Sequence, residues 1–288
     1  RELAESHVAP TTRRILLADV SQSLGQDISY PEAKRVVLTE VVRCSKRIVA
    51  AASVFQLGGD AKLITQCHHD SCGPPVKSFL FDLEEDTSRE KRYCQYVERL
   101  STALAHVTST FPGLDLQNRV AILVPDDAFL HGLRAVADPH PLFDRYSFLT
   151  ASESTALLID RQYRRATSQA LVLDTLANFD GIERLIIIAV GLDAPLGQGA
   201  EDMLETRSRL YRGLTRAHMM AIVVNESIQG GWLEWLNTVR LQKDLKFDRE
   251  AEMKRLNAEA AETLVKKRVD EINAALQAAV GKAQVALS

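Results

Sequence analysis

Short apolar runs rich in β-branched residues alternate with longer amphipathic segments over most of this 288-residue sequence. The runs that predict strands are 13–19, 76–83, 119–125, 170–175, 184–192 and 219–225. Several are apolar without alternation, which is typical of strands buried on both faces. Helices are predicted between them, including 87–108, 126–137 and 201–217. This pattern predicts an α/β fold with a doubly wound, mainly parallel sheet, and ligands in such sheets bind beyond the carboxyl ends of the strands.

The composition changes near Trp232, which predicts two domains, at 1–235 and 236–288. From about 237 to 280 the chain has no Pro or Gly and is rich in Glu, Lys, Arg, Ala and Leu. Apolar residues there fall mostly three or four positions apart, which predicts a long amphipathic helical tail. That helix could pack on the α/β body or pair with another chain as a coiled coil.

Bulk composition narrows the class of protein. An apolar content of 46% and a charged content of 25% are those of an ordinary soluble globular chain. The net charge of −3 gives no global attraction to nucleic acid, so such binding needs a local basic patch. The longest apolar run, 185–192, is too short to cross a bilayer, and four cysteines do not suggest a disulfide scaffold. We therefore expect an intracellular protein, cytoplasmic or nuclear, with no membrane partner. The chain begins with Arg rather than Met, which predicts a fragment.

Four segments contain residues suited to phosphate chemistry. A glutamine amide after a strand can both donate and accept a hydrogen bond, and a guanidinium is always charged and grips phosphate with paired N–H groups. In chain order the segments are ILLADVSQSL (15–24), LTEVVRCSKRI (38–48), LDTLANFDGIERLIIIAVGLD (173–193) and LYRGLTRAHMMAIVV (210–224).

Together, and in this order, the four segments resemble the C-terminal half of a superfamily-1 helicase or of a Schlafen-type helicase-like ATPase. The resemblance implies a RecA-like α/β lobe of the P-loop NTPase type. It implies that Gln22 senses the γ-phosphate of ATP, with Asp19 in the same motif beside the nucleotide. It also places Arg43 near the γ-phosphate and makes Arg216 the arginine finger that neutralises charge during transfer.

The same resemblance implies further contacts. Glu183 matches a glutamate that contacts the nucleotide ribose, and Tyr211 belongs to the motif around the finger. Thr175, Gly181 and Thr215 match positions at the nucleic-acid backbone. The sequence departs from the family pattern at Ala18, Val41 and Gly213.

Plainer interpretations stay open for the same residues. Gln22 could be a solvated loop residue, Arg43 could lie on the surface of an amphipathic helix, and Glu183 could form a surface ion pair with Arg184. The arginine-rich helix before Arg216 could likewise be a solvated face. The cysteines and histidines within 67–72 are potential zinc ligands, but their spacing is not that of a zinc finger, so no metal site is predicted.

A Walker A motif, G-x-x-x-x-G-K-[ST], does not occur in the sequence. ATP with Mg²⁺ would therefore be bound mainly by a separate N-terminal lobe that carries the Walker motifs. The leading hypothesis is the C-terminal half of a nucleic-acid-dependent ATPase or helicase (a hydrolase), with that lobe and single-stranded DNA or RNA as partners. We expect this chain to be inactive alone. The alternative is a non-catalytic, helicase-like interaction module that binds a protein partner through the C-terminal helix.

Overall fold

The computed structural model describes residues 40–57, 66–68, 71–84, 86–159, 168–194, 200–229 and 231–233. Three predictions fall outside the described residues. They are the strand at 13–19, the pair Asp19 and Gln22, and the helical tail within 236–288.

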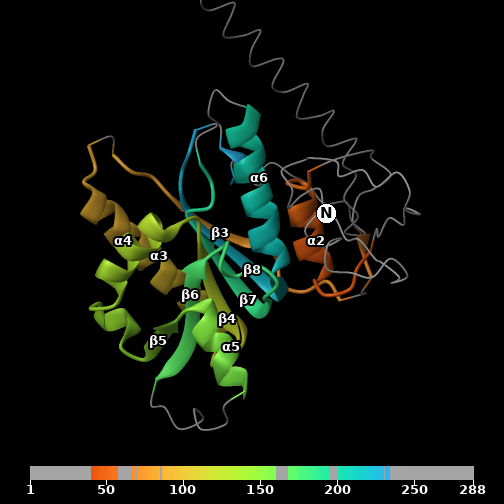
Figure 1. The fold of residues 1–288 in the computed structure, drawn as a ribbon, viewed down its shortest axis with the longest axis horizontal. Coiled ribbons are helices and arrows are strands. Elements are labelled where there is room, and N and C mark those ends of the chain that lie inside the picture. The colour runs from red at the N-terminus through yellow and green to blue at the C-terminus, as the bar shows by residue number, and fades with distance from the viewer. Residues whose placement is uncertain are drawn as a thin grey trace, which may run out of the picture.

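Six strands form one sheet in the order β3-β8-β7-β4-β6-β5, and every neighbouring pair is parallel (Figure 1). These strands are β3 (Lys77–Phe81), β4 (Val120–Val124), β5 (Tyr146–Leu149), β6 (Gln169–Thr175), β7 (Arg184–Val190) and β8 (Ala217–Glu226). Two short strands, β1 (Glu40–Val41) and β2 (Gln66–Cys67), form a separate parallel pair.

Helices cover both faces of the sheet (Figure 1). They are α2 (Lys46–Ser53), α3 (Arg89–Thr110), α4 (Asp127–Ala137), α5 (Ala151–Ile159) and α6 (Ala200–Thr215), with a 3-10 turn, η2, at Pro141–Phe143. Helices α3 and α4 pack together on one face, and α2 packs with α6 on the other.

The central strand β7 explains the unbroken apolar runs. Ile186 and Ile188 pack towards α3 and α4, whereas Ile187 and Ala189 pack towards α2 and α6. Because successive side chains point to opposite faces, a strand covered on both sides needs an apolar residue at every position. Burial on both faces therefore follows directly from the sequence pattern.

The predicted fold class is confirmed, because a six-stranded parallel sheet with helices on both faces fits the RecA-like α/β class. The strands predicted at 76–83, 119–125, 170–175, 184–192 and 219–225 are confirmed as β3, β4, β6, β7 and β8. The predicted helices are confirmed as α3, α4 and α6. The short elements β5 and α5 were not predicted. In the described ranges, no helix combines the length and the apolar character needed to cross a membrane.

Candidate functional site

Three segments that are far apart in the sequence meet at the amino-terminal edge of β7 and β8. Arg184 and Ala217, the first residues of these two strands, are register partners. The loop before α2 contacts the start of β8, because the backbone N–H of Ser45 donates to the carbonyl of His218 at 3.0 Å. Arg43, Glu183 and Arg216 are thereby brought to one edge of the sheet.

This edge is opposite to the one where we expected functional residues. The general rule for parallel sheets predicts them after the carboxyl ends of the strands. Helix α6, however, returns the chain from the carboxyl end of β7 to the start of β8. Arg216, in the turn between α6 and β8, consequently lies at the amino-terminal edge.

Arg216 is the most buried cation of the cluster, with 6% of its side chain exposed. Its Nη2 donates to Asp180 Oδ1 at 3.1 Å, and Arg212 forms an ion pair with the other carboxylate oxygen of Asp180. Burial, followed by repulsion from Arg43, lowers the pKa of Arg216. Its Nε is buried with no hydrogen-bond partner. One of the donors of the Arg216 side chain is therefore unused in the described structure.

Arg43 and Glu183 form the second half of the cluster. Arg43 pairs with one carboxylate oxygen of Glu183, and His218 Nε2 lies 2.9 Å from the other. The alternative in which Glu183 pairs with Arg184 is not what the structure shows. The Arg184 guanidinium instead donates to the carbonyl of Glu183 at 2.7 Å and to Ser154 Oγ at 2.8 Å.

Cys44 ties the Arg43 loop to the end of α6. Its Sγ donates to the carbonyl of Thr215 at 3.3 Å, and Cys67 Sγ donates to the carbonyl of Cys44 at 3.2 Å. Burial raises the pKa of Cys44 to about 11, so the thiol is neutral at physiological pH. This contact joins the residue after Arg43 to the residue before Arg216.

The predicted nucleic-acid residues are placed differently. Thr215 is buried, and its hydroxyl donates to the carbonyl of Tyr211 at 2.9 Å. Thr175 is buried at the carboxyl end of β6, on the opposite edge from Arg216, and its hydroxyl accepts from Asn178 N. Gly181 is exposed with a φ of 80°, a conformation that favours glycine. Thr175 therefore does not join the Arg216 cluster, and the nucleic-acid roles stay predictions.

Sequence reasoning missed Asp180, Arg212 and His218. A signal existed for each of them. Arg212 lies in the last turn of α6, four positions before Arg216 in the turn that follows the helix. Asp180 directly precedes the positive-φ Gly181, and His218 follows Arg216 by two positions.

One departure from the family pattern has a local explanation. A Cβ built on Gly213 would lie 2.7 Å from the Cδ1 of Leu192, so the space of an alanine methyl is filled by that leucine. Gly213 therefore reflects close packing between α6 and the chain after β7. It says nothing against a functional site.

Comparisons with known proteins were made by sequence and by structure. No protein-family model matches the chain. A search of curated proteins also gives no match.

Among solved structures, the C-terminal domain of a possible DNA helicase from Lactobacillus plantarum WCFS1 aligns with a TM-score of 0.40 at 14% identity, over 73% of this chain and 96% of that one. The C-terminal part of the Fun30 ATPase domain aligns with a TM-score of 0.25 at 18% identity, over 51% of this chain and 47% of that one. Scores this low carry no functional assignment to this chain.

Proposed function

We propose that this chain is the C-terminal half of a nucleic-acid-dependent ATPase of the helicase type. Its role is to present Arg43 and Arg216 to a nucleotide held by a separate, Walker-bearing lobe. The observation that supports this most is the charge balance of the cluster. Three guanidinium groups, on Arg43, Arg212 and Arg216, share two carboxylates, on Asp180 and Glu183.

A terminal phosphate suits this surplus of positive charge. Arg216 is held by packing on all sides but keeps an unpartnered Nε, and Arg43 reaches the same place from the loop before α2. Preorganised cations of this kind stabilise charge that develops during phosphoryl transfer, because they need no reorganisation at the moment of reaction. Bound ATP with Mg²⁺ supplies the phosphoryl group that passes to water.

In this proposal, the carboxylates of Asp180 and Glu183 pair with the arginines only until the phosphate binds. Asp180 is 46% exposed, so it can turn to solvent when an anion takes its place beside Arg216. Glu183 is released from Arg43 in the same way and becomes free for the ribose contact that the family resemblance implies. Closure of the two lobes would then couple nucleotide binding to the grip on single-stranded DNA or RNA.

The test joins this chain to a Walker-bearing lobe and measures ATP hydrolysis stimulated by single-stranded nucleic acid. We expect Arg216→Ala to lower the rate by about 10³–10⁵-fold, the usual contribution of an arginine finger. Arg134→Ala is the matched control, because Arg134 forms an exposed ion pair with Asp138 on α4. A rate for Arg216→Ala equal to that of the control would refute the proposal.

A further inference from the structure

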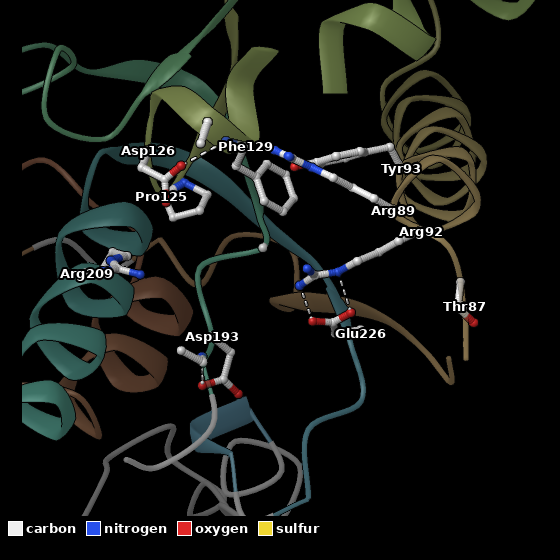
Figure 2. Close-up of a pocket in the computed structure, with 13 residues that line it drawn as sticks. Thr87, Arg89, Arg92, Tyr93, Pro125, Asp126, Phe129, Asp193, Arg209 and Glu226 are labelled. Carbon is white, nitrogen blue, oxygen red and sulfur yellow. Dashed lines mark hydrogen bonds and ion pairs between the residues drawn. The ribbon is translucent and has the colours of Figure 1, made fainter. Parts of the chain in front are cut away.

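A cavity of about 530 Å³ lies at the carboxyl edge of the sheet, opposite the Arg43–Arg216 cluster (Figure 2). None of the residues of that cluster lines it. Its walls come from the segments that follow the strands and from the starts of α3 and α4. The lining residues used below are Arg89, Arg92, Asp126, Phe129, Gly191, Asp193, Arg209 and Glu226.

The cavity lies where the chain direction switches between the two faces of the sheet. Strands β4 and β7 are neighbours, yet the chain passes from β4 to α4 on one face and from β7 to α6 on the other. Loops that diverge in this way leave a crevice at the carboxyl ends of the strands, where ligands of parallel α/β sheets bind. Gly191 allows the Phe129 ring to pack closely against the chain after β7, since a Cβ there would lie 2.6 Å from that ring.

The carboxylates of the cavity already have partners within the protein. Asp126 caps α4 by accepting from the N–H of Phe129 at 2.8 Å. Asp193 accepts three backbone N–H groups, from Ala194, Trp232 and Leu233. Glu226 takes a two-point ion pair from Arg92. Glu226 is therefore paired with a cation, and the oxygens of Asp126 and Asp193 accept backbone hydrogen bonds before any ligand arrives.

Two arginines of the cavity are held more loosely. The Arg89 guanidinium lies over the ring of Tyr93, 5.8 Å from its centroid, and no described carboxylate pairs with it. Arg209 pairs at 2.7 Å with Glu205, which is one turn away on α6 and 58% exposed. Exposed pairs of this kind are weak and exchange readily for a better anion. In Figure 2, Arg89 extends from α3 towards Phe129, and Arg209 lies across from it on α6.

We propose that this cavity binds a small phosphorylated ligand, with Arg89 and Arg209 holding the phosphate from its two sides. The volume is that of a pocket for a small molecule, and the two cations come from different helices that line it, α3 and α6. These features favour a small ligand over a nucleic-acid strand.

The test uses inorganic pyrophosphate as the probe and isothermal titration calorimetry on the whole chain. We expect saturable binding that Arg89→Gln and Arg209→Gln each weaken about tenfold, because each removes one charge-assisted contact. Arg145→Gln is the matched control for Arg89, since Arg145 also lies over a tyrosine ring, that of Tyr146 at the start of β5. Its affinity should match that of the unmodified chain.

Three results would overturn the proposal. The first is no saturable binding to the unmodified chain, or an equal loss in Arg145→Gln. The second is binding that Arg216→Ala abolishes and Arg89→Gln leaves intact, which would locate the anion at the amino-terminal edge. The third is a single-stranded oligonucleotide that displaces pyrophosphate and depends on Arg89, which would make the cavity part of a nucleic-acid track. The first two leave the proposed ATPase function standing.

Discussion

At the scale of single residues, Arg216 is buried although carboxylates compensate its positive charge only in part. A buried guanidinium is unfavourable unless anions and hydrogen-bond acceptors surround it. Arg216 shares Asp180 with Arg212 and has a buried Nε without a partner, so part of that requirement is unmet in the free chain. A terminal phosphate beside the Arg216 guanidinium, as proposed above, would compensate more of this charge. The incomplete compensation is therefore the physical reason for proposing a ligand at Arg216.

Cys44 gives a prediction on the dependence of stability on pH. Burial raises the pKa of its thiol from the ordinary 9.0 to about 11, so the folded state disfavours the thiolate. The neutral, buried Cys44 thiol contributes fully to the free energy of unfolding below pH 9. This contribution is lost as the pH rises towards 11, because the Cys44 thiol ionises at a lower pH in the unfolded chain than in the folded one. Urea unfolding across this interval should show a smaller decline in the free energy of unfolding for Cys44→Ala than for the unmodified chain. Cys72→Ala, at an exposed thiol, should not differ from the unmodified chain. Equal declines for Cys44→Ala and the unmodified chain would contradict the assignment.

At the scale of helices and strands, the contact between α3 and α4 determines the shape of one wall of the cavity. Tyr93 and Phe129 stack edge to face with their ring centroids 5.3 Å apart, and Gly132 of α4 accommodates the Tyr93 ring. A Cβ at Gly132 would lie 2.2 Å from that ring, well inside contact distance. The small residue is therefore a condition for the two helices to pack this closely.

Gly132→Ala should destabilise the protein even though alanine is the better helix former. The gain in helix propensity is about 1 kcal/mol, whereas overpacking costs roughly 1–3 kcal/mol. Chemical denaturation of Gly132→Ala, Tyr93→Leu and the double variant measures the change in the free energy of unfolding and so shows which effect is larger. We expect the double variant to lose less stability than the sum of the single changes, because the smaller side chain makes room for the methyl. Strict additivity would show that the close contact is not the cause.

At the scale of the whole molecule, the parallel sheet separates the two proposed ligand sites. Its amino-terminal edge gathers Arg43, Glu183 and Arg216, and its carboxyl edge carries the cavity between α3, α4 and α6. The two edges lie at opposite ends of the same strands, so a ligand at one does not compete directly with a ligand at the other.

The salt dependence of nucleic-acid binding separates the proposed ATPase half from the interaction module. When the chain is joined to a Walker-bearing lobe, its affinity for a labelled single strand should fall steeply with salt, because phosphate contacts release counterions. Fluorescence anisotropy at several salt concentrations measures the slope. A variant without 236–288 should keep that slope. A protein partner bound through the helix predicted at 237–280 should respond much less, and an affinity that hardly changes with salt would favour that alternative.

The amino-acid sequence by itself determined the α/β class, most strands of the sheet and helices α3, α4 and α6, because burial on both faces demands unbroken apolar runs and local periodicity reports helices. It also identified Arg43, Glu183 and Arg216 as candidates. Only the tertiary structure decided that these residues meet at the amino-terminal edge, that Asp180 and His218 join them, and that a cavity opens opposite. The Arg43–Glu183 pair joins positions 140 residues apart, and contacts at that separation depend on how the strands are ordered, which no local pattern encodes.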